Sequence, residues 1–230
     1  MYLDDVSHND GMARSAPVAF AELTPGWQTV FREAWESWQA SNYGIGAALI
    51  DPSTDRAISV GRNRVAQSTP EPGLLSGNMT AHAEMNAFAA LDRFNADGLH
   101  LYTTFQPCLM CAASAMLLKV SHVFFAANDE FFDDLDDLWQ HHPVTAARAP
   151  TTWGPFDGAQ TRLAQFARLL PMSFTLEHFP DRAAAALARE TNPSLAALAD
   201  QLAAGEATEL RRLETVDEAL EAVWDRLPTG

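Results

Sequence analysis

Two short segments contain the residues whose types and spacing could do chemistry: H-A-E at residues 82–84 and P-C-L-M-C at residues 107–111. If Cys108 and Cys111 begin a helix, they share one helical face, and both thiolates could reach one tetrahedral zinc ion at about 2.3 Å. The N-terminus of a helix favours anions, which helps to keep both sulfurs deprotonated. With His82 as a nitrogen ligand, three protein ligands leave one coordination position open, as is typical of catalytic zinc sites.

Glu84 follows His82 by two residues, so on a helix it points in a different direction and is free for another role. From the first helical turn its carboxylate could reach a water at the open position of the metal. Zinc lowers the pKa of such a water from about 15.7 to near 7, and a nearby carboxylate can take its proton and return it to a leaving group. The sequence therefore predicts Glu84 as the catalytic residue, with His82, Cys108 and Cys111 as ligands of Zn²⁺.

Each of these features has a common alternative explanation when it stands alone. A C-x-x-C pair that follows a strand and begins a helix can be a thioredoxin-like redox pair, and a zinc site can be purely structural. A single histidine at a helix start usually caps the helix or packs in the core, and a single glutamate in the first turn usually interacts with the helix dipole. The H-x-E segment, the proline before Cys108 and the absence of a third cysteine together favour a catalytic metal site.

The elements predicted around these segments alternate between strand and helix, which indicates an α/β fold with a sheet covered by helices. We expect strands over residues 44–50, 57–65, 99–105, 121–127 and 173–179, and helices over 25–38, 81–94, 108–119 and 161–170. Residues 1–23 are predicted to be a loose arm, 67–79 a loop and 143–158 a connection. After residue 181 the chain becomes rich in alanine, leucine and glutamate, has no motif with chemistry, and is predicted to be helical.

Composition and charge restrict the location and the partners. The chain has 230 residues, 47% of them apolar, and no apolar run long enough for a membrane span. The acidic start of the chain has no signal-peptide pattern, so we expect a cytoplasmic protein. Lysine and arginine number 15 against 30 acids, a net charge of −15, which argues against a nucleic-acid partner. Six of the acids lie in the stretch 129–137, which we interpret as a solvated helix face.

Three segments resemble the cytidine deaminase superfamily, in the branch that contains tRNA adenosine deaminases, guanine deaminases and related nucleoside deaminases. They are H-A-E at 82–84, T-F-Q-P-C-L-M-C-A at 104–112 and V-F-F-A-A-N-D at 123–129. H-x-E together with P-C-x-x-C is a recognised signature of zinc deaminases. The resemblance covers roughly residues 25–180. It implies a three-layer α/β/α sandwich with a five-stranded mixed sheet, and a hydrolytic attack on an amidine-like ring carbon that releases ammonia.

The resemblance also implies three substrate-binding residues and a homodimer. Asn63, in the segment G-R-N-R at 61–64, matches a substrate-contacting asparagine, although an exposed asparagine at a strand end is the alternative. The backbone of Ala83 matches an amide contact, and Asp129 matches a residue of the substrate pocket, with a plain solvated acid as the alternative. Gln106 departs from the family pattern, which usually has glutamate there. Glutamine keeps hydrogen bonding but loses charge, which puts the tuning of the site in question.

The sequence therefore predicts a zinc-dependent deaminase domain over residues 1–180 and a helical C-terminal extension over 181–230. The leading hypothesis is hydrolytic deamination of a small aminated heterocycle, such as a free purine or pyrimidine base or a nucleoside. Editing of adenosine in tRNA is the alternative, but it calls for a basic surface that this composition does not favour. A zinc-bound module without turnover is a third hypothesis, against which Glu84 counts.

Overall fold

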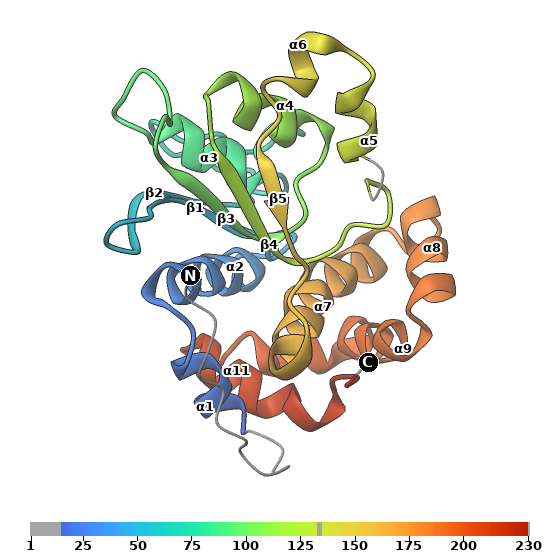
Figure 1. The fold of residues 1–230 in the computed structure, drawn as a ribbon. Helices are drawn as coiled ribbons and strands as arrows, with labels where there is room; N and C mark the ends of the chain where they lie inside the picture. Colours follow the sequence, from blue (N-terminus) through green and yellow to red (C-terminus); the bar gives the residue numbers. More distant parts are fainter. Residues whose placement is uncertain (1–14, 133–134, 230) are drawn as a thin grey trace.

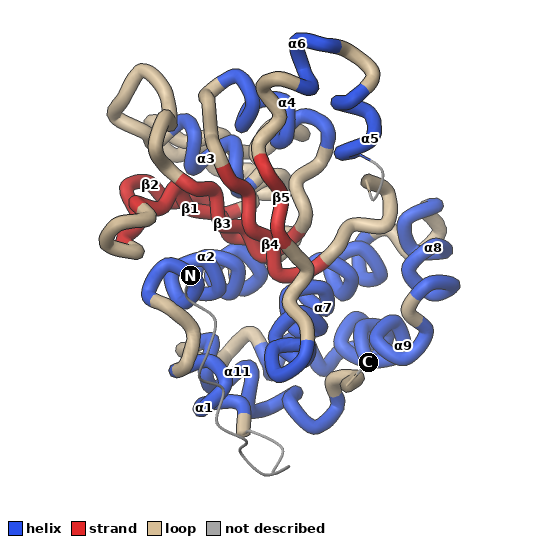
Figure 2. Tube along the Cα trace, viewed as in Figure 1, coloured by secondary structure: helices blue, strands red, loops and turns tan. Residues whose placement is uncertain are grey.

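Five strands form one mixed sheet with helices on both of its faces, which confirms the predicted α/β architecture (Figures 1 and 2). The computed structural model describes residues 15–132 and 135–229. The strand order is β2-β1-β3-β4-β5, in which β1 runs antiparallel to β2 and β3, while β3, β4 and β5 are parallel. The strands are β1 (Gly46–Asp51), β2 (Arg56–Arg62), β3 (His100–Phe105), β4 (His122–Ala127) and β5 (Thr151–Trp153).

Helices cover both faces of the sheet. Successive residues of an inner strand such as β1 point to opposite faces, and because they are apolar, both faces need to be buried. Ala47 and Leu49 of β1 pack against one layer of helices, and Ala48 and Ile50 pack against Val30 on the other side. The first layer contains α3 (Ala83–Ala89) and α4 (Leu109–Leu117), and the second contains α2 (Pro25–Gln39) and α7 (Thr161–His178). Thr24 is the N-cap of α2.

A glycine lets α3 approach the sheet closely. A Cβ atom at Gly61 of β2 would lie 2.3 Å from the carbonyl oxygen of Ala83 and 2.3 Å from the amide nitrogen of Ala87. No side chain fits in that gap, so any other residue would push α3 away from β2. Gly61 therefore fixes where α3 begins, and with it the position of the two residues that flank Ala83.

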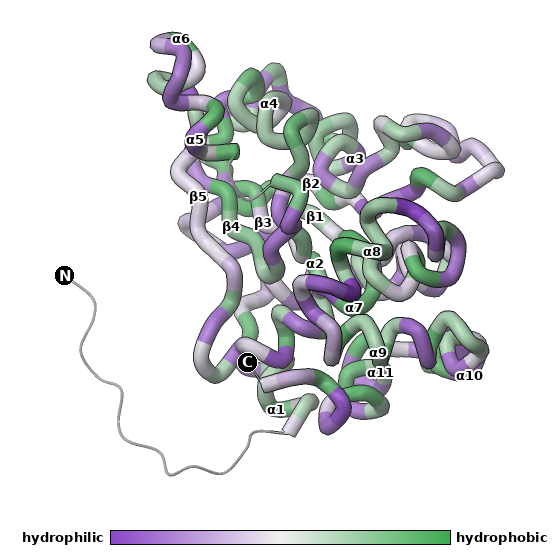
Figure 3. The backbone as a smooth tube through the Cα atoms, turned by 90° about the vertical axis from the view of Figure 1, so that its right-hand side faces the viewer, coloured by the Kyte–Doolittle hydropathy of each residue, from purple (hydrophilic) through white to green (hydrophobic). Residues whose placement is uncertain are grey.

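The remaining helices are α1 (Ala16–Ala21), α5 (Leu135–Gln140), α6 (Pro143–Ala146), α8 (Ala183–Thr191), α9 (Pro193–Gln201), α10 (Ala207–Leu210) and α11 (Val216–Val223). Those after residue 181 share an apolar cluster with α1, α2 and α7, in which Trp35, Phe166, Leu195 and Leu220 are buried. Both α9 and α11 contain hydrophobic and hydrophilic residues (Figure 3), and the buried residues of α11 recur at helical spacing, as expected of a helix with one buried face. A capping box formed by Thr215 and Glu218 begins α11. A domain boundary near residue 180 stays a prediction.

The prediction of a strand over residues 173–179 is wrong, because α7 continues through this segment to His178. The segment has no clear helical period, since α7 is buried around most of its circumference. Trp38 Nε1 donates a hydrogen bond to Ser173 Oγ at 2.9 Å, which satisfies a polar group in this core. The fifth strand is β5, a three-residue segment inside the stretch predicted as a connection, paired with β4 from His122 to Phe124.

Two smaller expectations are also corrected. Part of the predicted loose arm, residues 16–21, is the helix α1, whose Phe20 is buried, whereas residues 1–14 lie outside the described part of the chain. The acidic stretch is not one solvated helix: residues 129–132 form a turn, α5 begins at Leu135, and residues 133–134 lie outside the described part. Within the described residues, no helix has both the length and the apolar character needed to cross a membrane.

Candidate metal centre

His82, Cys108 and Cys111 come together at the starts of two neighbouring helices. His82 is the N-cap of α3, Cys108 is the N-cap of α4, and Cys111 lies in the first turn of α4. His82 Nδ1 lies 3.5 Å from each sulfur, and the two sulfurs lie 3.7 Å apart. A tetrahedral zinc ion with ordinary bond lengths places two sulfurs about 3.8 Å apart and a sulfur and a nitrogen about 3.5 Å apart. The three side chains therefore fit a zinc ion.

Hydrogen bonds within the metal-free cluster shift the pKa values of its three residues in different directions. Hydrogen bonds from Cys111 and His82 lower the pKa of the Cys108 thiol to about 4. The pKa of the Cys111 thiol is raised, because Cys111 donates its proton to Cys108 and is buried. The hydrogen bond to Cys108 also raises the pKa of His82. A metal ion must therefore displace the protons of Cys111 and His82 when it binds.

Glu84 lies beside this cluster with its carboxyl group out of contact with bulk water. The residue is only 4% exposed, Oε2 lies 3.4 Å from Cys111 Sγ, and Oε1 lies 3.5 Å from Thr103 Oγ1. Burial raises the pKa of Glu84 to about 7. A carboxyl group with such a pKa can both accept and release a proton near neutral pH, which is what general acid–base catalysis needs.

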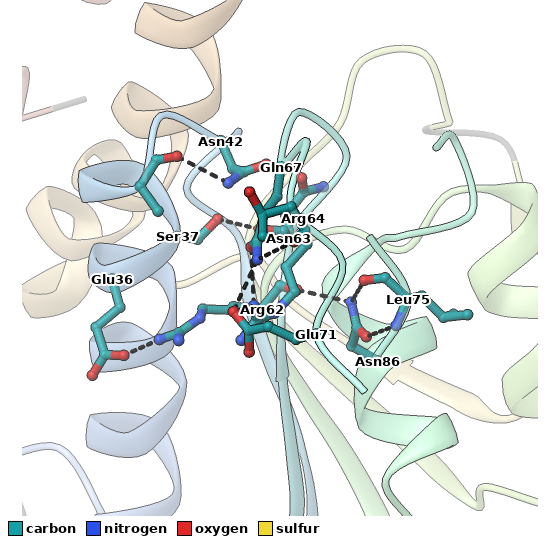
Figure 4. A network of polar contacts seen from close by, with 12 residues as sticks. Glu36, Ser37, Asn42, Arg62, Asn63, Arg64, Gln67, Glu71, Leu75 and Asn86 are labelled. Carbon is teal, nitrogen blue, oxygen red and sulfur yellow. Dashed lines mark hydrogen bonds and ion pairs between the residues drawn. The ribbon is translucent and has the colours of Figure 1, made fainter. Parts of the chain in front are cut away.

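Asn63 is buried immediately after β2, which rules out the exposed alternative (Figure 4). Its backbone N–H donates to the carbonyl oxygen of Ile45 at 2.8 Å, and its Oδ1 accepts from the N–H of Val65 at 3.1 Å. Among the described residues no acceptor is found for its Nδ2, and the side chain lines the cavity beside His82. The amide nitrogen of Asn63 is therefore available as a donor to a bound molecule.

Asp129 is half-buried and is not a fully solvated acid. Its Oδ1 accepts from the N–H of Phe131 at 3.0 Å, and its own N–H donates to Gln106 Oε1 at 3.1 Å. Burial raises the pKa of Asp129 to about 6. Ala83 differs from the other predicted contacts, because its side chain packs against the sheet and it does not line the cavity. An amide contact from Ala83 stays a prediction.

A cavity of about 370 Å³ joins these groups into one site. Its polar lining includes Asn63, His82, Glu84, Cys108 and Asp129. The rest of the lining is mainly apolar, and much of it comes from two helices that the sequence did not associate with the site. From α7 and α8 these residues are Arg168, Pro171, Met172, Thr175, Ala184, Leu187 and Ala188. Apolar residues at helical spacing indicate a buried face without showing what it covers, so no local signal identified them.

Comparison with known proteins finds similarity to deaminases that have a zinc-binding region. Residues 26–127 match the family model described as cytidine and deoxycytidylate deaminase zinc-binding region. A tRNA-specific adenosine deaminase of Streptococcus pyogenes serotype M1 is 28% identical over 124 residues, which cover 54% of this chain and 69% of that protein. Its counterpart from Aquifex aeolicus is 28% identical over 154 residues, which cover 62% of this chain and 92% of that protein.

Solved structures of two deaminases match part of the chain, both with TM-scores below 0.5. A tRNA:A34 deaminase gives a TM-score of 0.45 at 26% identity, covering 55% of this chain and 94% of that chain. A guanine deaminase from Nitrosomonas europaea gives a TM-score of 0.47 at 20% identity, covering 76% of this chain and 98% of that chain.

Proposed function

We propose that the chain hydrolytically deaminates a small, uncharged aminated heterocycle, a free purine or pyrimidine base or a nucleoside. Residues 26–127 support this proposal, because they match the family model of the cytidine and deoxycytidylate deaminase zinc-binding region. The observation that carries the proposal is the cavity that joins the cluster of His82, Cys108 and Cys111 and the buried Glu84 to a largely apolar wall. In the reaction, water adds to the ring carbon that bears the amino group, and ammonia leaves.

Each polar group at the site has a part in this reaction. His82, Cys108 and Cys111 would hold zinc, which when bound would supply Lewis-acid activation of the attacking water. Glu84 takes a proton from that water and delivers it to the substrate, so that the amino group can leave as ammonia. Asn63 Nδ2 and the Asp129 carboxyl group bind the polar edge of the ring, and apolar residues such as Ile45 and Phe105 pack against its faces.

The charges around the cavity support an uncharged substrate. Arg62 pairs with Glu36 on α2, and Arg64, with its side chain 8% exposed, is 2.6 Å from Glu71 (Figure 4). Arg168, the basic residue that lines the cavity, pairs with Glu130 at 2.6 Å. Each of these three arginines is thus matched by a carboxylate. A phosphate group would compete with these partners, and a polyanion would also meet a net charge of −15.

Editing of tRNA is the second candidate function, because the named relatives at 28% identity are tRNA-specific adenosine deaminases. The charge balance argues against it, since a tRNA enzyme needs basic residues that are free to contact phosphates. A zinc-bound module without turnover is a weaker candidate, because nothing in such a module requires a buried carboxyl group at Glu84. The homodimer implied by the sequence resemblance stays a prediction.

A side-by-side deamination assay tests the proposal. The zinc-loaded protein is incubated with guanine, adenine, cytosine, their ribonucleosides, dCMP and a tRNA substrate, at low and physiological salt. We expect ammonia release from at least one neutral base or nucleoside, with little dependence on salt, and no inosine in tRNA. Efficient editing of tRNA without turnover of any small compound would replace the proposal with the second candidate.

A further inference from the structure

Arg168 of α7 contacts the residue before Asp129 and the residue after it. Its Nη2 donates to the carbonyl oxygen of Asn128 at 3.0 Å and lies 2.6 Å from Glu130 Oε1. We infer that Arg168 is a positioning residue, which sets the Asp129 carboxyl group in the cavity and holds α8 across it. This inference rests on the proposed function, in which Asp129 binds the substrate.

The environment of the pair makes this contact more than a surface ion pair. The side chains of Arg168 and Glu130 are 17% and 22% exposed, and Arg168 Nε is buried without a hydrogen-bond partner among the described residues. A charged hydrogen bond of this length in a poorly solvated site is stronger than an exposed one. Loss of either partner leaves the other charge poorly solvated, so the segment must shift to bring it to water.

Glu130 extends the contact to α8. Its Oε1, which receives Arg168, also lies 3.4 Å from Thr191 Oγ1 at the end of α8. That helix places Ala184, Leu187 and Ala188 in the cavity wall, yet Ala185 is its one fully buried residue. With so small an apolar contact, the position of α8 depends on polar contacts at its ends. Arg168 therefore joins α7, the Asp129 turn and α8 at one point beside the substrate.

The inference is tested with Arg168→Met, which removes the charge but keeps much of the side-chain length. Arg168→Lys is the conservative variant, and Arg162→Met is the matched control. Arg162 lies on the same helix, and its Nη1 is 3.6 Å from Oδ1 of Asp225, whose side chain is 99% exposed. Three readouts are compared: zinc content, kcat and KM for whichever base or ribonucleoside of the panel the wild type deaminates best, and amide hydrogen exchange of residues 183–191.

We expect Arg168→Met to raise KM by about tenfold or more, with kcat changed much less, because one charged hydrogen-bond system is lost while zinc and Glu84 are untouched. Amide exchange in α8 should become faster, and zinc content should stay at the wild-type level. Arg168→Lys should have a KM between those of the wild type and Arg168→Met. Wild-type KM in Arg168→Met overturns the inference, even if α8 exchanges faster, because Arg168 would then have only a structural role.

Glu130→Gln keeps the test decisive if Arg168→Met does not fold. It removes the charge from the other side of the pair, so both KM and the rate of α8 exchange should rise. A wild-type KM overturns the inference here as well. Failure of the proposed function is recognised separately, because the wild type would then deaminate no compound of the panel. The hydrogen-exchange comparison would still decide whether Arg168 holds α8. If α8 exchanges at the same rate in Arg168→Met as in Arg162→Met, Arg168 does not hold this helix.

Discussion

Gln106 holds Asp129 in place through a hydrogen bond of 3.1 Å between Gln106 Oε1 and the backbone N–H of Asp129. The other end of the same amide, Nε2, donates to the carbonyl oxygen of Phe132 at 3.1 Å. Both halves of the side chain are thus used to fix the turn over residues 129–132. Glutamate, the usual residue of the family that the sequence resembles, could make the first of these bonds but not the second.

Gln106→Glu should therefore weaken substrate binding without loss of zinc. The variant loses the donor to Phe132 and places a second carboxylate beside Asp129, and a lost hydrogen bond of this kind costs about 1 kcal/mol. We expect KM to rise by about fivefold or more with kcat less affected, measured by steady-state kinetics with zinc content determined in parallel. Gln106→Met loses both bonds without adding charge and serves as the comparison. Wild-type KM in both variants would mean that the turn is held by other contacts.

Glu84→Gln should keep the fold and the zinc and lose nearly all turnover. The amide has almost the same size as the buried carboxyl group, but it cannot accept and return a proton. General acid–base catalysis supplies about 10²–10⁴-fold, and Glu84 serves more than one proton transfer, so we expect kcat to fall by about 10³-fold or more. Rates of ammonia release and metal analysis on the same sample measure both effects. Activity close to that of the wild type would show that another group is the base.

Cys111→Ser should lose zinc and lower the thermal stability. Cys111 is fully buried, and metal binding is coupled to local folding. Elemental analysis should find about one zinc per chain in the wild type, and close to none in the variant. Ser114→Ala in the same helix is the control and should keep the metal, because Ser114 Oγ only donates to the carbonyl oxygen of Met110. A chelator should lower the Tm of the wild type and leave that of Cys111→Ser unchanged; equal zinc content in both proteins would refute the assignment.

Glu177 should contribute stability that depends on pH. Arg211 Nη2 lies 2.7 Å from Glu177 Oε2, and this hydrogen bond lowers the pKa of Glu177 below its ordinary value of 4.5. Because the folded state holds the proton more weakly than the unfolded state, the stabilisation is present above pH 4.5 and is lost as the pH falls through the lowered pKa. Glu177→Gln should therefore lower Tm by about 2–4 °C near pH 7.

The same difference should shrink when the melting curves are repeated at pH values below the ordinary pKa of glutamate. Glu209→Gln is the control, because its pair with Arg212 has side chains 74% and 69% exposed and should contribute little at any pH. A Tm difference for Glu177→Gln that stays constant over the whole pH range would show that the loss is one of packing.

The residues of the metal centre could be predicted from the sequence because each belongs to a local pattern. His82 and Cys108 stand where a helix begins, and Cys111 is one turn further, so their relative positions depend on helix geometry and on the neighbouring strands β2, β3 and β4. The strands β1 and β4 are short, mainly apolar runs, which is a strong signal. Local sequence patterns are thus enough to predict most of the metal centre.

The cavity wall could not be predicted because it depends on contacts between distant segments. Met172 and Thr175 of α7 fall in or next to the segment that was predicted as a strand, since a helix buried on several sides loses its amphipathic period. Arg168 lies in a predicted helix, but nothing in its neighbourhood indicated that it pairs with Glu130, 38 residues before it. Asp129 was recognised only by resemblance, because one acid in an acidic stretch has no local signal of burial.

Asn63 provides the final prediction, because its two side-chain atoms have separable roles. Oδ1 accepts from the N–H of Val65, whereas Nδ2 lines the cavity. Asn63→Ala removes both, and Asn63→Asp keeps the acceptor while replacing the donor. Both variants should lower kcat/KM for the neutral substrate by about tenfold or more, since a buried polar partner is lost. The effect should change little between low and physiological salt, because no charge on the substrate is involved. Asn63→Asp should also retain more of the wild-type Tm. Wild-type kcat/KM in Asn63→Asp would mean that Asn63 only shapes the chain after β2 and donates nothing to the substrate.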